Sequence, residues 1–364
     1  MGLRGYQVEA FNAITKGFGE FQKQLAVKPT GCHAPGSPIL MADGSLRAVE
    51  TIRVGEQVMG PDSQPRTVME LHSGSDDMFE IDPVKGDPFA VNAGHILRLR
   101  KTPESPLHRE PVHTEISLTD YLSTSQNFRH LHKLERFGVE FPETQVAGRP
   151  LDPYFLGLLL GDGCLHQKQI MVCTPDHEII EMLVRFSQMY GVRLRRVDLT
   201  NNAADNYYFV GKEPGYDSDP IRSFVRRLGL AVKSGEKFIP DGYKRGSWEI
   251  RADLLAGLLD TDGHGSNGGY EYSSKSPTLS EDVVFVARSL GLAAYRSKKI
   301  VGCETYYRVN ISGDCSWLPL RVERKKVEVR RQIKIPLVTG FTVHPVGRGE
   351  YFGFTIDGDH LYLD

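Results

Sequence analysis

Two apolar stretches with the same spacing of glycine and aspartate stand out in the hydrophobic pattern of the chain. Residues 155–163 read FLGLLLGDG, and residues 255–263, one hundred positions later, read LAGLLDTDG. Each stretch predicts a buried helix, and a glycine at its third position lets two such helices approach closely. Each helix is expected to end at its Asp-Gly pair. Packed side by side, the helices would bring Asp162 and Asp262 together at one end of their interface.

Around these helices the pattern changes along the chain. Residues 38–99 predict short β-strands separated by glycine and aspartate turns. Residues 101–145 are polar and less regular, and residues 151–331 have a helical, mixed α/β texture. Strand texture returns after residue 340. The simplest account is an all-β domain interrupted by an α/β insertion.

Composition and charge narrow the classes of protein. A length of 364 residues allows two or three domains. The net charge of −2 gives no overall nucleic-acid signature, so a DNA surface would have to be local. One candidate is residues 321–334, with seven Lys or Arg against two Glu, and another is residues 129–136. Taken alone, each is better explained as a solvated face.

The cysteines and the apolar runs indicate where the protein works. Five cysteines without a CxxC spacing favour free thiols in a reducing compartment. The sequence shows neither an apolar run of membrane-spanning length nor a signal-peptide core. We expect a soluble protein of the cytoplasm or nucleoid, with no membrane partner.

The repeated motif also predicts a metal site. Two carboxylates a few ångströms apart repel each other unless they share a cation. Oxygen ligands suit Mg²⁺, which can activate water for phosphodiester cleavage. An ordinary pair of core helices would not require the same register twice.

This pair of motifs resembles the LAGLIDADG homing endonucleases. The second copy matches the family name at seven of nine positions, departing at Leu259 and Thr261, and the first copy matches at Gly157, Leu158, Asp162 and Gly163. The resemblance implies that Asp162 and Asp262 bind the divalent metal, Mg²⁺. It also implies that the backbone carbonyls of Gly161 and Thr261 can add ligands.

The same resemblance implies catalytic lysines and a DNA partner. Lys237, in the segment EKFIP, matches the lysine block of the family, and Lys298 or Lys299 is the expected symmetry partner from the second repeat. A lysine beside the metals can stabilise charge on the phosphate or orient water. Double-stranded DNA would lie across saddle-shaped sheets and be held by contacts to its phosphates.

The flanking segments resemble the Hint fold of inteins, which are self-splicing protein segments. Cys32 would be the first intein residue, and Asn92 to His95 stands where the family has Thr-x-x-His. Residues 350–363, with His360, resemble the next-to-last splicing block. The implied fold class is mixed: an all-β, horseshoe-like Hint domain split by a pseudo-twofold α/β endonuclease domain. The expected boundaries are 1–31 for a host segment, 32–145 and 334–364 for the two Hint parts, of which the second is incomplete, and 146–333 for the endonuclease.

The Hint resemblance implies chemistry that needs no cofactor. The Cys32 thiolate can attack the carbonyl of Gly31, which has no side chain to hinder it, and turn that amide into a thioester. His95 is the natural proton source for the departing amide nitrogen. Asn92 would donate a hydrogen bond in place of the family threonine.

Two departures from the intein pattern change the expectation. Gly353 stands where a carboxylate is often found. The chain stops at Asp364, before the His-Asn and the downstream nucleophile of the family. We therefore expect thioester formation and N-terminal cleavage, but no splicing by this chain alone. A truncated or incomplete reading frame would explain the ending. So would the long half of a split intein, whose partner is a short C-terminal fragment.

The first 31 residues suggest the host. Residues 24–31, QLAVKPTG, resemble the start of a superfamily 2 helicase whose phosphate loop is interrupted after Gly31. The expected DNA target is then the uninterrupted host gene, and the host extein segments are partners. An active helicase is rejected because the chain has no Asp-Glu box. A DNA-binding intein without cleavage activity stays open, and a secreted Hint autoprocessing domain is disfavoured.

Overall fold

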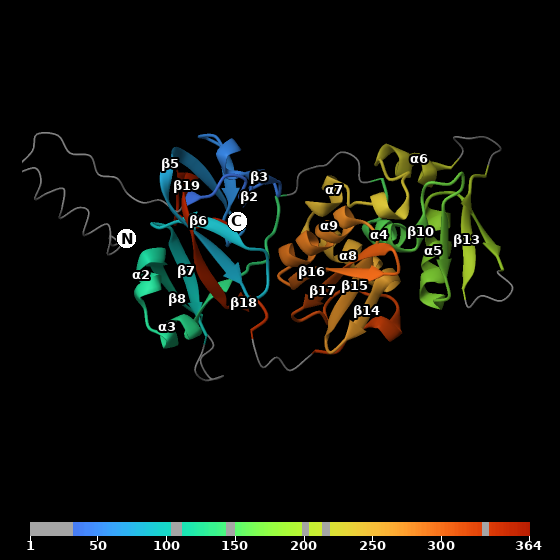
Figure 1. Ribbon diagram of the computed structural model, residues 1–364. Coiled ribbons are helices and arrows are strands. Elements are labelled where there is room, and N and C mark those ends of the chain that lie inside the picture. Colours follow the sequence, from blue (N-terminus) through green and yellow to red (C-terminus); the bar gives the residue numbers. More distant parts are fainter. Residues whose placement is uncertain (1–31, 103–110, 143–149, 199–203, 213–218, 330–334) are drawn as a thin grey trace, which may run out of the picture.

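The computed structural model describes residues 32–102, 111–142, 150–198, 204–212, 219–329 and 335–364. They form two lobes side by side, one rich in β-strands and one mixing helices and sheets (Figure 1). The helicase-like segment 1–31 lies outside the described residues. The described residues have the expected mixture of antiparallel sheets and helices.

The β-rich lobe is built on two long antiparallel strands that come from distant parts of the chain. Strand β5 (Pro65–Pro83) pairs with β19 (Phe341–Ile356) from Phe341 opposite Pro83 to Ile356 opposite Val68. The five-stranded sheet has the order β19-β1-β6-β5-β4, so the extra pairing of β19 with β5 closes it on itself. Its short strands are β1 (Cys32–His33), β4 (Gln57–Met59) and β6 (Phe89–Asn92).

A second sheet and short helices complete this lobe. The sheet has the order β18-β9-β7-β8 and a separate hairpin pairs β2 with β3. Their bounds are β2 (Pro38–Leu40), β3 (Leu46–Ala48), β7 (Ile96–Lys101), β8 (Val112–Ser117), β9 (His132–Glu135) and β18 (Val338–Thr339). The helices are η1 (Val49–Thr51), α2 (Leu118–Ser123) and α3 (Gln126–Leu131). The region expected to be irregular, 101–145, thus contains β8, α2, α3 and β9. Ser117 and Ser125 cap the two helices.

The second lobe repeats one order of elements. The first half contains α4 (Pro153–Gly161), β10 (Gly163–Cys164), β11 (Met171–Thr174), α5 (His177–Met189), β12 (Arg193–Val197), β13 (Asp205–Val210) and α6 (Pro220–Arg227). The second half contains α8 (Trp248–Asp262), β14 (Gly263–Ser266), β15 (Gly269–Ser274), α9 (Pro277–Ser289), β16 (Ala293–Val301) and β17 (Glu304–Ser312). Their sheets have the matching orders β10-β11-β13-β12 and β14-β15-β17-β16. Between and after them lie η2 (Ser234–Glu236), α7 (Asp241–Lys244) and η3 (Glu323–Lys325).

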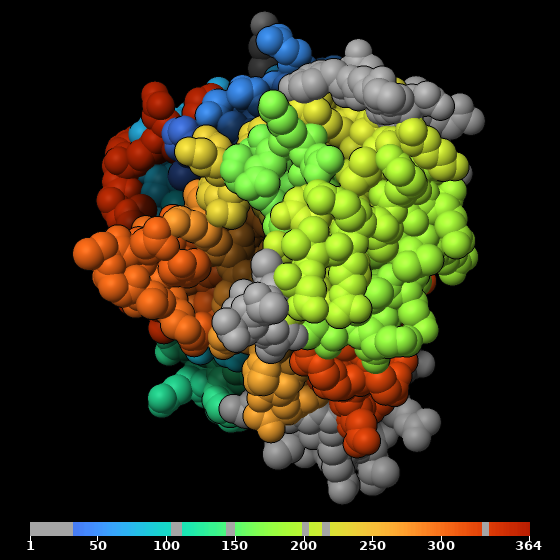
Figure 2. All heavy atoms as spheres, turned by 90° about the vertical axis from the view of Figure 1, so that its right-hand side faces the viewer, coloured from blue at the N-terminus to red at the C-terminus, as the bar shows by residue number. Residues whose placement is uncertain are grey.

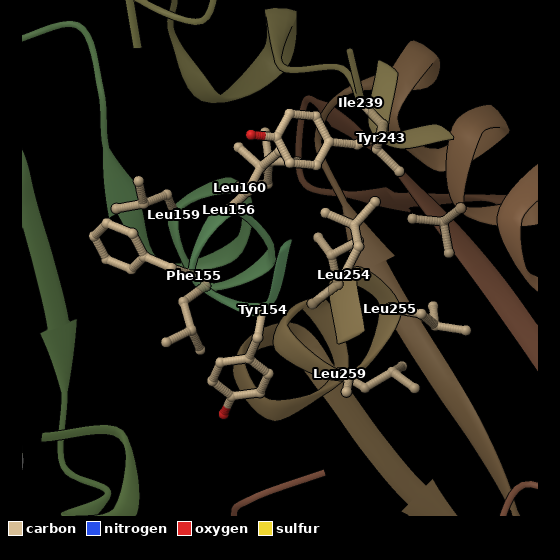
Figure 3. Close-up of a cluster of buried hydrophobic side chains, with 14 of the residues drawn as sticks. Tyr154, Phe155, Leu156, Leu159, Leu160, Ile239, Tyr243, Leu254, Leu255 and Leu259 are labelled. Atoms are coloured by element: carbon tan, nitrogen blue, oxygen red, sulfur yellow. The ribbon is translucent and has the colours of Figure 1, made fainter. Parts of the chain in front are cut away.

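Helices α4 and α8 meet at glycines, as the motif predicts. A Cβ on Gly257 would lie 2.2 Å from the Tyr154 carbonyl oxygen and 3.0 Å from the Cα of Gly157, so backbone touches backbone. Large side chains point elsewhere: Phe155 extends from α4 away from α8, and Leu255 extends from α8 away from α4 (Figure 3). Each helix therefore fills the core of its own half while the glycines form the contact.

A buried arginine joins the two lobes. Arg251 of α8 is 0% exposed and donates hydrogen bonds to the Val139 carbonyl (2.8 Å) and to Ser289 Oγ (2.6 Å). Glu140, which follows Val139 in the chain, accepts a hydrogen bond from the Trp248 backbone N–H at 3.0 Å and so caps the N-terminus of α8. A small apolar cluster spans the junction, formed by Leu40, Met59, Val139 and Phe141 with Phe285 and Leu363 packed against it.

We expect Gly257→Ala to lower the free energy of unfolding of the α/β lobe by roughly 1–3 kcal/mol, because the added methyl group forces the helices apart. Urea unfolding followed by tryptophan fluorescence measures this, since both tryptophans, Trp248 and Trp317, lie in this lobe. The matched control is Gly235→Ala, where the nearest atom would be 3.9 Å away. Equal midpoints for the two variants would contradict the close helix contact.

Candidate active sites

The two motif aspartates lie at the adjoining C-terminal ends of α4 and α8. Asp162 is the C-cap residue of α4, and Asp262 is the last residue of α8. The helix ends touch, because a Cβ on Gly161 would lie 1.9 Å from Thr261 Oγ1. The Asp262 side chain reaches solvent, but the surrounding helix ends partly desolvate it. This burial, together with the neighbouring Asp162 carboxylate, raises the pKa of Asp262 to about 6.

Lys237 lies buried against the end of α4. Its Nζ donates to the carbonyls of Leu160 (2.8 Å), Gly161 (2.9 Å) and Gly163 (2.8 Å). Burial lowers the pKa of Lys237 to about 8, and the two aspartates oppose the shift. A cation at a helix C-terminus also complements the helix dipole. The predicted lysine therefore adjoins the aspartate pair.

The equivalent position at the end of α8 is taken by Lys325. Its Nζ donates to the carbonyls of Asp260 (2.8 Å) and Thr261 (2.5 Å), and the side chain is buried. Burial lowers the pKa of Lys325 as well. The structure thus places Lys325, rather than the expected Lys298 or Lys299, at the position related to Lys237 by the pseudo-twofold.

Strand register explains why Lys298 does not reach the aspartates. Directly paired residues of adjacent antiparallel strands share a face of the sheet. Two positions from Lys298 on β16, Arg296 pairs with the buried Val309 and forms an ion pair with Glu281 of α9 at 2.7 Å. Lys298 therefore projects to the helix-covered side of this sheet, at its exposed end. Lys299 projects to the opposite, open face.

Asp260 anchors the segment that carries Lys325. Its buried carboxylate accepts from Tyr154 Oη (2.7 Å) and from the backbone N–H groups of Arg321 (2.7 Å) and Val322 (3.3 Å). The Arg321 guanidinium lies over the Tyr154 ring, 4.2 Å from its centroid. Sequence reasoning treated residues 321–334 as a surface charge patch and missed this role. The sequence feature that could have indicated this role is Asp260 itself, the first aspartate of the second motif.

The donor set fits a hard divalent cation that also binds substrate oxygens. Among the residues that the structure describes, no group of three or more His, Cys, Asp or Glu side chains could hold a metal alone. Two carboxylates with raised pKa values remain, Asp162 and Asp262. Mg²⁺ is commonly held by one or two carboxylates together with water and phosphate. The carbonyls of Gly161 and Thr261 already accept from the lysines, which leaves each oxygen one lone pair.

Each sheet of this lobe has a face turned away from its helices, here called its open face, which carries polar and aromatic side chains. At the β16 edge of the second sheet this face meets the β-rich lobe, where Lys85 and Arg136 lie over the Tyr295 ring, each 5.3 Å from its centroid. In the first sheet, one row across the strands is Cys164, Met171, Tyr208 and Arg195, and the related row in the second sheet is His264, Glu271, Asn310 and Tyr295. The alternate rows carry buried residues such as Val172 and Tyr272, which face the helices. The open faces thus offer hydrogen-bonding groups next to the aspartate pair.

The β-rich lobe surrounds Cys32. Cys32 is 2% exposed and lies in β1 between β6 and β19, where its partner in the register is Gly353. His95 follows β6, and its ring is held against the Cys32 backbone. Burial lowers the pKa of His95, and the adjacent His33 ring lowers it further. Within the described part of the chain, the buried Nδ1 of His95 has no hydrogen-bond partner.

His33 and Tyr362 are site residues that sequence reasoning missed. The His33 ring is buried, its centroid lies 5.0 Å from that of His95, and its Nε2 is 2.8 Å from Tyr362 Oη. Burial lowers the pKa of His33 to about 4. The position of His33, directly after the expected nucleophile Cys32, could have marked it as a site residue. Its neighbours His95 and Tyr362, however, are far from it in the sequence.

The other expected residues of this site lie as follows. Asn92 is buried at the end of β6 and donates to the Asp76 carboxylate at 3.2 Å. His360 is exposed in a turn with φ of 62°. The histidine whose ring lies beside that of His95 is His33.

Comparisons with known proteins match two segments of the chain to sequence families. Residues 32–147 match the sequence family described as Hom_end-associated Hint, and residues 249–318 match the LAGLIDADG-like domain family. Each match covers less than half of the chain: the first segment is similar to Hint domains and the second to LAGLIDADG-like domains. In the structure of the described residues, no helix is both long and apolar enough to cross a membrane.

Several curated proteins are similar in sequence to parts of this chain. It is 27% identical to the homothallic switching endonuclease of Saccharomyces cerevisiae over 248 residues, which is 58% of this chain and 42% of that protein. It is 33% identical to the replicative DNA helicase DnaB of Mycobacterium intracellulare over 150 residues, 41% of this chain and 20% of that protein. It is 32% identical to the catalytic subunit of the V-type proton ATPase of Candida tropicalis over 97 residues, 24% of this chain and 9% of that protein. The chain thus spans less than half the length of each of these relatives.

Similar solved structures include the homing endonuclease I-DmoI in complex with DNA and Mn, with a TM-score of 0.32 and 15% identity over 45% of this chain and 89% of that one. The gp41-1 intein matches with a TM-score of 0.18 and 12% identity over 24% of this chain and 80% of that one.

The raised pKa of Asp262 predicts how metal binding depends on pH. The metal-free lobe should lose stability as pH rises from about 4 through 6, because the folded state retains a proton that the unfolded state has lost. Mg²⁺ requires the ionised carboxylate, so the melting-temperature gain from Mg²⁺ should be largest above about pH 6 and fade below it. Scanning calorimetry at a series of pH values measures both effects. A gain that is independent of pH, or that persists in Asp262→Asn, would contradict the metal site.

Proposed function

We propose that this chain is an intein whose Hint lobe cleaves the peptide bond before Cys32 and whose α/β lobe cuts double-stranded DNA. One observation carries the proposal. Asp162 and Asp262 lie together at two helix ends, and each of these ends is capped by a buried lysine, Lys237 or Lys325. A structural helix contact does not need two carboxylates and two ammonium groups at the same end.

The roles in DNA cleavage follow from the charges. Asp162 and Asp262 would hold Mg²⁺, which when bound neutralises phosphate charge and lowers the pKa of its water. Lys237 and Lys325 lie beside the carboxylates, where a positive charge stabilises the pentavalent phosphate of the transition state. The open faces of the two sheets would receive the duplex, with arginines such as Arg195 contacting phosphates or bases.

The roles in self-cleavage follow from the buried Cys32 site. The Cys32 sulfur would attack the carbonyl carbon of Gly31, so that a carbon–sulfur bond forms and the carbon–nitrogen bond breaks. The thiol proton ends on the freed Cys32 amine. His95 would pass this proton to the departing nitrogen, because its ring is held against the Cys32 backbone. Asn92 would support the peptide as an amide donor.

The host and the DNA target are further parts of the proposal. The interrupted loop at residues 24–31 supports a helicase host, and the target would be the host gene without the insert. Cysteines outside disulfides among the described residues, such as Cys303 and Cys315, support work in a reducing compartment. The host extein segments would be the protein partners. A DNA-binding intein without cleavage activity is the competing proposal, and the retained aspartates and lysines count against it.

We expect dithiothreitol to release residues 1–31 from the protein, because a thiol can take over the acyl group from a Cys32 thioester. Mass spectrometry should detect the released segment from the parent but not from Cys32→Ala. Cys315→Ala is the matched control, since Cys315 is also buried but lies in the other lobe. Equal release from all three proteins would show that Cys32 is not the nucleophile.

Asp162→Asn and Asp262→Asn should each abolish cleavage of a plasmid that carries the uninterrupted host gene, while leaving thiol-induced release unchanged. Loss of either carboxylate removes metal ligands, and the Cys32 site lies in the other lobe. Gel electrophoresis in the presence of Mg²⁺ measures the cleavage, and binding is followed separately by gel shift. If the parent binds this DNA but does not cut it, the binding-only alternative holds.

A further inference from the structure

The segments that carry Lys237 and Lys325 are each held by the opposite half of the α/β lobe. Each lysine places its ammonium group on the helix end of its own half. The backbone next to each lysine, however, is fixed by the helix of the other half that follows the first hairpin. These helices are α9 for Lys237 and α5 for Lys325.

For Lys237 the hold comes from α9. Ser276, the N-cap residue of α9, is 0% exposed and donates from Oγ to the Lys237 carbonyl at 2.6 Å. Asp282 of the same helix accepts from the Ile239 backbone N–H at 2.8 Å. The first-half lysine is therefore seated by second-half residues.

For Lys325 the hold comes from α5. Asp176 occupies the N-cap position of α5, yet its carboxylate caps nothing there. It accepts instead a bidentate pair of hydrogen bonds from Arg324, with Nε and Nη2 each at 2.8 Å. Glu178 accepts from the Glu323 backbone N–H at 3.1 Å. Figure 2 shows the orange-red segment that contains these residues lying against the yellow-green first half.

We propose that Asp176 and Arg324 form a positioning pair that seats Lys325 at the end of α8 from the opposite half of the lobe. A bidentate pair fixes the orientation of the guanidinium as well as its distance. Arg324 directly precedes Lys325, so this fixes the backbone from which the lysine reaches the Asp260 and Thr261 carbonyls. The inference rests on the proposed DNA cleavage for its catalytic meaning but not for its geometry.

The arrangement predicts that the two lysine positions can be impaired separately. Ser276 seats Lys237 through bonds that do not involve Asp176 or Arg324. Loss of the Asp176–Arg324 pair should therefore weaken the Lys325 position and spare the Lys237 position. If each position serves one strand of the duplex, the damaged protein should nick one strand and cut the other slowly.

The first test is cleavage of the uninterrupted host gene in a supercoiled plasmid, with each strand end-labelled separately. Arg324→Gln is the main variant. Asp176→Asn removes the other partner of the pair. It is the second variant because the pKa of Asp162, which is raised mainly by burial, is also raised by the Asp176 charge, so this variant changes more than the pair. We expect one strand to be cut about tenfold more slowly, with nicked plasmid accumulating. The double variant should be no slower than either single variant, because both remove the same interaction.

The matched control is Arg196→Gln. Arg196 pairs with Asp205 at 2.5 Å, and the side chains of that pair are 63% and 16% exposed, against 62% and 13% for Arg324 and Asp176. This control loses an ion pair of the same type and exposure in the same lobe, so it should cut both strands like the parent. Equal slowing of both strands in Arg324→Gln would overturn the positioning role.

The second test needs no DNA. Acylation by an amine-reactive ester, followed by mass spectrometry, reports how accessible each lysine is. In Arg324→Gln, Lys325 should be modified several times faster than in the parent, while Lys237 keeps its rate. An unchanged rate for Lys325 would overturn the proposal. If the parent fails to cut DNA, the proposed function falls, and this labelling still decides whether the pair seats Lys325.

Discussion

The close approach of α4 and α8 is the constraint on which the α/β lobe depends. At Gly157 and Gly257 there is no side chain between the two backbones, so the relative position of the helices is set by backbone contact. Packing at this density tolerates little displacement. The C-terminal ends then adjoin, which places Asp162 beside Asp262 and Gly161 beside Thr261. The same contact lets the apolar side chains of each helix fill the core of its own half.

The helix ends concentrate charge that must be balanced. Desolvation at the helix ends raises the pKa of Asp262, and repulsion from the Asp162 carboxylate raises it further. The buried ammonium groups of Lys237 and Lys325 offset this negative charge, and they also donate hydrogen bonds to carbonyls at the helix ends. Neither lysine belongs to the helix whose end it caps. Lys237 and Lys325 each lie in a later segment of the chain, and residues of the opposite half of the lobe hold that segment in place. The lobe is therefore a pair of interlocked halves.

The β-rich lobe encloses the Cys32 site with strands from both ends of the described chain. β19 pairs with β5 along most of its length and holds β1 on one side, so the residues around Cys32 depend on the pairing of distant segments. The lobes meet where Arg251 of α8 binds the segment around Val139. The helix that carries Asp262 is thereby tied to the lobe that carries Cys32.

Local patterns in the sequence determined the helices of the repeated motif, their glycine contact and the aspartate pair, whereas the candidates Cys32, His95 and Lys237 came from the resemblance to inteins and homing endonucleases. The local patterns could do so because a helix contact has a fixed spacing and an Asp-Gly pair marks where the helix ends. Tertiary structure alone decided that Lys325, and not Lys298, caps α8. Strand register places Lys298 on the helix-covered face of its sheet. Asp260 and Asp176 bind the segment that begins at Arg321, which the sequence alone suggests is a charged surface. Tertiary structure also decided that His33 lies beside His95 and that Tyr362 contacts His33. Contacts between residues so far apart in the sequence depend on how the strands pair.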